Sequence, residues 1–342
     1  MFESLKTVRR ALLLLDPGEG RITYRGFHAQ PPATERLERI MQCFIAHYNF
    51  AVEQGMSEPL IDHIHMVDTE LQGFAYEAAA MGLHVLDAAV PFCRGHVERL
   101  MSHAPQHRPL LYVGIGFARG ALHLSCEREL ERHTNVARVW IVDGYAFCRV
   151  IFHTEHTLHA QHVPARIARN IDLSEPFDAG VGRGMWFALG GDPERIASCI
   201  RAFPERRRTA LWRGVGFGAT YAGGSDLAAL LRLAELAHID HGALALGCAL
   251  ACHARHMAGN VAPHNRVAAE ALCACSSDVL HDVVATAIDT LGDQATQSDG
   301  VQTWPRLLRQ ISSRLLAVRM ASVRALDGNT SPLPWASRAA GG

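Results

Sequence analysis

The chain has 342 residues, of which 49% are hydrophobic and 20% are charged. Its 33 basic and 34 acidic residues nearly balance, so it lacks the concentrated basic surface that nucleic-acid binding requires. The apolar run Ala11–Leu15 is far shorter than the roughly 20 residues of a membrane-spanning helix, and it lacks the cleavage pattern of a secretory signal. We therefore expect a cytoplasmic protein with no integral membrane span and no nucleic-acid partner.

Two further expectations follow from the composition. The nine cysteines are scattered, odd in number and mostly within apolar helical patterns, which is typical of buried free thiols in a reducing compartment. The high apolar content predicts apolar surface beyond a single core, lining either a cavity or the interface of a homo-oligomer.

Apolar residues recur at three- and four-residue steps along most of the chain, which is the pattern of amphipathic helices. The β-branched stretch 136–142 is the one segment where a strand competes with a helix. Alternating strand patterns are otherwise almost absent, so the predicted fold is all-α, built from paired helical units. Helices are expected at residues 34–54, 62–90, 96–102, 145–158, 225–237, 242–257, 264–273, 278–291 and 305–326, with others after Gly116 and from Asp192.

The chain nearly repeats itself about 100 residues on, since Leu111–Ala118 returns as Leu211–Gly218 and Asp143–Phe147 is echoed, at a similar offset, by His241–Ala245. Such echoes predict internally duplicated helical units with a pocket where they meet, although Gly-rich helix starts also resemble one another by composition alone. The predicted organisation is an N-terminal helical segment, a first and a second repeat unit, C-terminal helices and a disordered tail. Their boundaries are 1–60, 61–170, 171–275, 276–326 and 327–342.

Glycines are placed at or near expected helix ends, as in Gly114-Ile115-Gly116 and Gly214-Val215-Gly216. Because glycine inside a helix costs roughly 1 kcal/mol relative to alanine, their repeated use predicts a close backbone approach, between helices or to a ligand. The Gly-x-Gly-Phe pattern lacks the third glycine and the acidic residue of a dinucleotide site, so we expect no nucleotide cofactor.

Two carboxylates are the catalytic candidates. Glu77 stands in the apolar stretch Ala78–Met81, so it is either buried with a partner or lines a pocket. Asp143 is expected at a buried helix start, where an acid serves either as a proton donor with a raised pKa or as a helix cap. Arg183 is the approximate repeat equivalent of Glu77, which predicts a Glu77–Arg183 pair that either serves the site or only joins the two halves.

The substrate-binding candidates combine cations with aromatic side chains. Arg119, Arg149 and Arg183 lie in apolar helical segments and could meet an anionic group or orient the acids. Aromatic residues gather in the landmark segments, where most would build the core and a subset would shape an apolar cavity and stabilise a cation. Those chosen as substrate-binding residues are Tyr76, Phe117, Tyr145, Trp186, Phe217 and Tyr221, beside Phe147, Phe152 and Phe187 in the same segments.

The histidines leave a metal site open as an alternative. His153 and His156 share a helix face, and His253 and His256 repeat that spacing 100 residues on, so four imidazoles could converge on one ion. The other interpretation is that they are ordinary polar-face histidines. Nothing matches a known zinc motif, so no metal is the expected outcome.

The landmarks resemble a protein family known as domain of unknown function 1702, over roughly residues 5 to 320. Members often lie in bacterial gene clusters for enediynes, polyketides and related specialised metabolites, and the resemblance implies that setting but no reaction. The family often has histidine after its Asp-Gly-x-Gly-Phe run, where this chain has Cys148, so a role for that histidine does not transfer. The matching segments are Arg25–Phe27, Gly73–Glu77, Ala79–Met81, Asp143–Phe147, Phe152–His153, Gly182–Phe187, Leu211–Gly216, Tyr221–Gly224 and Pro263–His264.

These observations favour a biosynthetic enzyme that acts on a lipophilic polyene, isoprenoid or polyketide intermediate. Cyclisation or isomerisation by acid–base or cation chemistry requires no cofactor, which suits a chain without cofactor motifs. The first alternative is a non-catalytic helical scaffold or carrier that binds a lipophilic metabolite or a synthase partner. The second alternative is a histidine-ligated metal enzyme.

Overall fold

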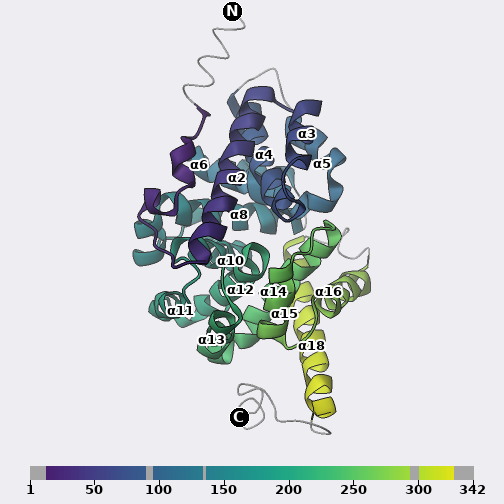
Figure 1. Ribbon diagram of the computed structural model, residues 1–342. Helices are drawn as coiled ribbons and strands as arrows, with labels where there is room; N and C mark the ends of the chain where they lie inside the picture. Colours follow the sequence, from purple (N-terminus) through teal and green to yellow (C-terminus); the bar gives the residue numbers. More distant parts are fainter. Residues whose placement is uncertain (1–12, 90–94, 134–135, 293–299, 327–342) are drawn as a thin grey trace, which may run out of the picture.

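The structure is a computed structural model that describes residues 13–89, 95–133, 136–292 and 300–326. Within these ranges every regular element is a helix, so the predicted all-α fold is confirmed (Figure 1). The tail predicted to be disordered from Asp327 lies outside the described residues.

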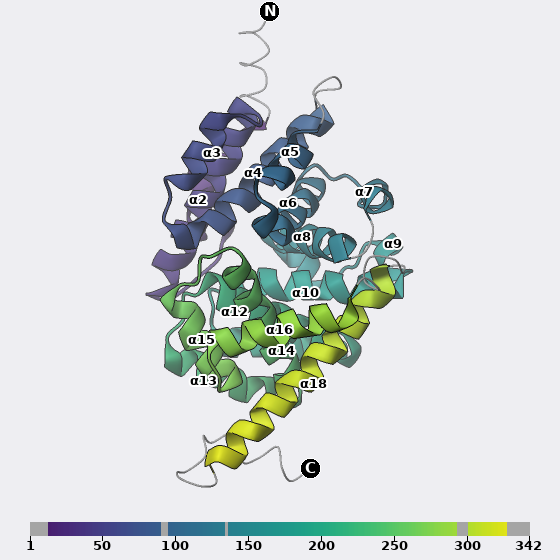
Figure 2. The ribbon, with the colours of Figure 1, turned by 90° about the vertical axis from the view of Figure 1, so that its right-hand side faces the viewer.

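A succession of long helices forms the body, and each packs mainly on the next long helix along the chain. Shorter helices connect them, and the last long helix crosses diagonally over several of the others (Figure 2). The long helices are α2 (Ala33–Gln54), α4 (Thr69–Ala89), α6 (Arg108–Ala121), α8 (Val136–Phe152), α10 (Ile171–Ala188), α12 (Glu205–Ala222), α14 (His241–Met257), α16 (Ser277–Leu291) and α18 (Gly300–Leu326).

The connecting elements are mostly single short helices with recognisable start signals. Asp192 and Asp226 cap the helices that follow them, at starts that the sequence predicts. These elements are η1 (Pro17–Gly20), η2 (Ile22–Arg25), α3 (Glu58–His65), α5 (His96–His103), η3 (Pro105–His107), α7 (Glu127–Arg132), the π-helix η4 (Glu155–His159), α9 (Ala165–Ala168), α11 (Pro193–Ala202), α13 (Leu227–Ala237), η5 (His238–Asp240) and α15 (Pro263–Cys273).

Neighbouring long helices touch backbone to backbone at glycines. A Cβ atom on Gly144 would overlap the carbonyl oxygen of Val113, and one on Gly214 would overlap that of Ala179. The predicted close approach between helices is therefore present. The prediction that these glycines mark helix ends is wrong for Gly116 and Gly214, which lie inside α6 and α12, because the contact outweighs the helix-propensity cost of roughly 1 kcal/mol.

Three other expectations about the elements change. The β-branched stretch 136–142 is helical, as the first half of α8, because it is buried between other helices instead of in a sheet. The helix expected over 62–90 is two helices, α3 and α4, separated at residues 66–68. The last helix begins at Gly300, with Pro305 tolerated in its first turns.

The 100-residue echo falls on corresponding long helices, α6 with α12 and α8 with α14. The helices nevertheless form one continuous row in which α8 packs on α10, so the predicted duplication stays a prediction. The predicted domain boundaries likewise stay untested.

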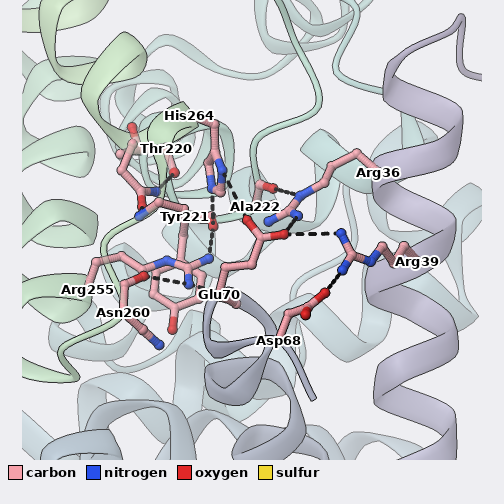
Figure 3. A network of polar contacts seen from close by, with 12 residues as sticks. Arg36, Arg39, Asp68, Glu70, Thr220, Tyr221, Ala222, Arg255, Asn260 and His264 are labelled. Atoms are coloured by element: carbon pink, nitrogen blue, oxygen red, sulfur yellow. Dashed lines mark hydrogen bonds and ion pairs between the residues drawn. The ribbon is translucent and has the colours of Figure 1, made fainter. Parts of the chain in front are cut away.

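Polar contacts join the beginning of the row to its later helices (Figure 3). Arg36 on α2 donates Nε to the carbonyl oxygen of Ala222 at 2.8 Å and Nη1 to Glu70 at 2.6 Å. Arg255 on α14 donates Nη1 to the backbone carbonyl oxygen of Glu70 at 2.6 Å. The row therefore curls back on itself, which encloses space between α4 and α12.

Among the described residues, no single helix is both long and apolar enough to cross a membrane. The bent pair α15 and α16 passes the same test of length and composition only when taken together, across a 75° bend. The eight described cysteines carry no disulfide, in agreement with the prediction of free thiols.

The glycine contacts predict the effect of adding one methyl group. Gly214→Ala should lower the free energy of unfolding by about 1–3 kcal/mol, because the new Cβ overlaps the α10 backbone. Gly242→Ala is the matched control: it lies in α14 with open space around it, so alanine should be neutral or add up to about 1 kcal/mol. Urea denaturation of both variants measures this, and equal stability of the two would contradict the packing.

Candidate functional site

An apolar cavity of about 60 Å³ lies between α2, α4, α6, α8 and α10. The N-terminal segment that contains η1 and η2 covers it. Six phenylalanines dominate the wall, and Glu77 is the charged residue contributed by the long helices. The cavity is lined by Leu15, Glu19, Arg25, Ile40, Met41, Phe44, Ile45, Phe74, Glu77, Phe117, Phe147, Ile151, Phe152 and Phe187.

Two charged residues of the covering segment also line this cavity. Glu19 and Arg25 form an ion pair, and the Arg25 guanidinium lies 4.2 Å from the ring centre of Phe152. Because these two charges neutralise each other, the covering segment adds no net charge to the cavity.

Glu77 lies in the middle of α4, a helix buried on nearly all sides, and the residue is 2% exposed. The α6 backbone packs directly on the Glu77 carbonyl at Gly114, so α6 fits closely against α4 at this level. No hydrogen bond or salt bridge engages the Glu77 carboxyl among the residues that the structure describes. A carboxyl group in such surroundings favours its neutral form.

Burial raises the pKa of Glu77 to about 8. The Arg183 guanidinium acts in the opposite direction with a smaller effect, and the Asp143 carboxylate adds to the rise. Glu77 therefore holds its proton at neutral pH while it faces an apolar cavity, which is the state of a general acid.

A second cavity, of about 10 Å³, lies behind Glu77. Glu77, Arg183, Phe217 and Tyr221 line it together. Glu77 therefore borders both the phenylalanine-lined cavity and a smaller cavity that it shares with Arg183 and Tyr221.

Arg183 is paired with Asp143, with 2.9 Å between Nη2 and Oδ1 but without the angles of a hydrogen bond. Its guanidinium also lies 4.3 Å from the ring centre of Phe217, a cation–π contact. The predicted Glu77–Arg183 ion pair is therefore wrong: Arg183 pairs with Asp143 instead, because α10 packs mainly on α8 and α12, and α8 carries Asp143.

Asp143 lies inside α8 and not at a helix start, so it is no helix cap. Burial raises its pKa to about 6, although Arg183 and then Arg213 lower it. Arg213 forms an ion pair with Glu175, and burial lowers the pKa of Arg213 to about 10. A third cavity, of about 20 Å³, is bordered by Asp143 and Arg213.

The structure brings together six of the predicted site residues. Glu77 and Phe117 line the main cavity, Glu77, Arg183, Phe217 and Tyr221 line the second, and Asp143 and Phe217 line the third.

The other predicted residues do not line these three cavities. Arg119 donates Nε to the Ser125 carbonyl oxygen at 3.0 Å, and Trp186 donates to that of Gly223 at 2.9 Å. Tyr76 stacks on His107, Arg149 contacts His156, and Tyr145 is half-buried on α8.

The two histidine pairs do not meet. His153 lies against His123 and His156 stacks on His162, whereas His253 and His256 both stack on His281. In the described part of the chain, no group of three or more His, Cys, Asp or Glu side chains is arranged to hold a metal ion. The predicted convergence of four imidazoles is therefore wrong.

Sequence reasoning missed several residues of the site. Arg213 stands where the earlier landmark has Val113, so comparing the two landmarks position by position would have exposed a charge in an apolar line. Phe74 lies three residues before Glu77 and belongs to the same landmark segment, Gly73–Glu77. Glu175, in contrast, carried no signal, because its neighbours are polar and proline.

A family model described as Protein of unknown function (DUF1702) matches residues 4–311. The chain therefore belongs to this family, as its landmarks indicated. No curated protein and no solved structure matches the chain.

The raised pKa of Glu77 predicts how stability depends on pH. Below the pKa that Glu77 has in the unfolded chain, the acid is neutral in both states and burying it carries no cost from ionisation. As pH rises above that value toward the folded-state pKa near 8, Glu77 increasingly destabilises the folded state relative to the unfolded state. Glu77→Gln removes this dependence, so the stability of the variant relative to the native chain should increase by more than about 2 kcal/mol between pH 4 and pH 9.

Urea denaturation across this pH range measures the difference. Glu270→Gln is the control, because Glu270 is exposed on α15. Asp143 titrates in both proteins, so the difference curve isolates Glu77. Parallel curves for the native chain and Glu77→Gln would show that the acid is not held neutral.

Proposed function

We propose that this protein is an enzyme that isomerises or cyclises a lipophilic unsaturated substrate, with Glu77 as the proton donor. One observation carries the proposal: a neutral carboxyl without a hydrogen-bond partner among the described residues faces a cavity walled by six phenylalanines. Such a group is poised to protonate carbon, since no protein acceptor competes for its proton.

The reaction starts when Glu77 transfers its proton to a carbon–carbon double bond. One O–H bond breaks, one C–H bond forms, and a carbocation remains on the substrate. The phenylalanine faces stabilise this cation through their π systems. Loss of a proton from a neighbouring carbon to the Glu77 carboxylate, directly or after ring closure, forms the product and restores the acid. Substrate and product have the same formula, and the step requires no oxidant or reductant.

Arg183 supports the transient Glu77 carboxylate. Its guanidinium lowers the pKa of Glu77, and its charge is already present before the reaction. Asp143 holds Arg183 in place through their ion pair, so Arg183 and Asp143 are positioning residues in this mechanism.

The covering segment controls access to the acid. The cavity of about 60 Å³ is smaller than the roughly 150 Å³ space that accepts a benzene molecule in an engineered cavity. A polyene therefore enters only when the segment with Leu15, Glu19 and Arg25 moves from the cavity. This opening replaces the Arg25–Phe152 contact with substrate.

The family resemblance supplies the biological setting of the proposal. Members in bacterial gene clusters for enediynes and polyketides favour a polyene, isoprenoid or polyketide intermediate as the substrate, and a cytoplasmic location.

A non-catalytic carrier is the second candidate. Leu316 and Met320, 60% and 49% exposed on α18, favour it, because α18 presents an apolar surface that a synthase partner or a second copy could cover. In a carrier, Glu77 would exchange no proton with the ligand. Replacing Glu77 would then leave the chemical structure of the ligand unchanged.

Replacement of Glu77 in the native host separates the two candidates. Glu77→Gln keeps the size of the side chain but removes the transferable proton, so product formation should fall by at least about 100-fold. The metabolite that accumulates should have the same mass as the missing product, which mass spectrometry and chromatographic separation measure together.

Glu129→Gln is the matched control, because Glu129 is a buried glutamate on α7 that lines none of the three cavities. It should leave product formation unchanged. A Glu77→Gln strain that makes the normal product would sink the enzymatic proposal and favour the carrier.

A further inference from the structure

We infer that the Tyr221 hydroxyl is a proton-relay group that connects Glu77 with solvent through one water in the small cavity behind it. This inference rests on the role proposed for Glu77. Tyr221 does not touch the main cavity, so it is a positioning and relay residue and not the acid itself.

Glu77 from α4 and Tyr221 from α12 face the same cavity of about 10 Å³, which has room for about one water molecule. Arg183 also lines it, so three of its lining residues carry polar side-chain groups, which is within the two to four partners that a buried water requires. Arginine does not give up its proton in proteins. Tyr221 is therefore the group in this cavity that can exchange a proton with Glu77.

The Tyr221 hydroxyl lies directly over α4 at Gly73. A Cβ atom on Gly73 would overlap the hydroxyl oxygen, so only glycine leaves space for it. Gly73 and Glu77 are four residues apart and share one face of α4, which places the hydroxyl one helical turn from the carboxyl. The Glu77 charge is close enough to raise the pKa of Tyr221, as burial does more strongly.

The ring of Tyr221 is held while its hydroxyl is left without a hydrogen-bond partner among the described residues. The Arg255 guanidinium lies 3.9 Å from the ring centre, and the rings of Phe217 and Phe74 lie 5.6 and 5.2 Å away (Figure 3 shows Arg255 and Tyr221). The hydroxyl is fully buried and has no partner of ordinary hydrogen-bond geometry. A hydroxyl in this state is free to rotate between donating and accepting.

Asn260 continues the polar path away from Glu77. The residue is 3% exposed, and neither its amide nitrogen nor its amide oxygen has a hydrogen-bond partner of ordinary geometry among the described residues. The amide is close enough to Tyr221 to affect the pKa of that hydroxyl, and it belongs to the loop between α14 and α15 (Figure 3). The path from Glu77 therefore leads through Tyr221 toward a loop that borders solvent.

The relay moves one proton without any net change in bonding. When Glu77 is a carboxylate, the water donates a proton to the carboxylate and receives one from the Tyr221 hydroxyl. The Tyr221 oxygen then takes a proton from a solvent water on the loop side, where the Asn260 amide is a hydrogen-bonding neighbour and does not itself transfer the proton. Each transfer breaks one O–H bond and forms another, and the result is one proton moved from solvent to Glu77. A complete turnover returns the proton to Glu77 from the substrate, so the relay restores the acid after a cycle that ends without this return, and it does so without water entering the phenylalanine-lined cavity.

Infrared spectroscopy of the free protein tests the relay without a substrate. The carbonyl band of the protonated Glu77 acid is assigned as the band that Glu77→Gln removes. At pH 5, where the acid is protonated, the protein is switched from H₂O to D₂O and the shift of this band is timed. Tyr221→Phe should slow the exchange at least tenfold, whereas Tyr112→Phe, a half-buried tyrosine outside the cavities, should leave it unchanged.

Exchange in Tyr221→Phe at the native rate would overturn the relay and assign the proton route to the covered side of the main cavity. If Tyr221→Phe does not fold, 3-fluorotyrosine at position 221 keeps the hydroxyl and makes it more acidic, so exchange should become faster, and an unchanged rate would overturn the relay. The proposed function fails by a different observation, the absence of the Glu77 acid band at pH 7, which leaves the exchange measurement at pH 5 intact.

Discussion

Contact between helix backbones at glycines is the constraint on which the rest of the structure depends. Gly114 packs on the backbone of Glu77, Gly180 on that of Asp143, and Gly247 on that of Arg213. Each charged residue therefore occupies the level of a helix crossing, on α4, α8 and α12. Because the backbones touch there, these side chains have no space between the helices and reach into the enclosed cavities instead.

This placement decides the charge of each carboxyl. The charge of Asp143 is balanced by Arg183, and the charge of Glu175 is balanced by Arg213. These two ion pairs carry no net charge. Glu77 is left as the acid without its own cation, and its neutral form is the one that avoids a buried unpaired charge. The neutral acid is thus a consequence of the order of the helices.

Local sequence was sufficient for the helices, for the close approach at glycines and for the burial of Glu77, because periodicity and composition report burial directly. It was insufficient for the partner of Arg183, since only the packing of α8 on α10 shows that Asp143 is nearer than Glu77. The helix ends expected at Gly116 and Gly214 failed for a related reason: a glycine that permits a tertiary contact has the same local signature as one that ends a helix.

The cost of burying Glu77 is the strongest argument for catalysis over carriage. A carrier for an apolar ligand would be more stable with glutamine or an apolar residue at this position, because a buried carboxyl is unfavourable over most of the pH range in which it would ionise. The chain instead retains an acid that faces six phenylalanines, with a cation nearby that stabilises its ionised form. An arrangement that destabilises the fold but lets one proton leave and return is the one that the proton transfer proposed for Glu77 requires.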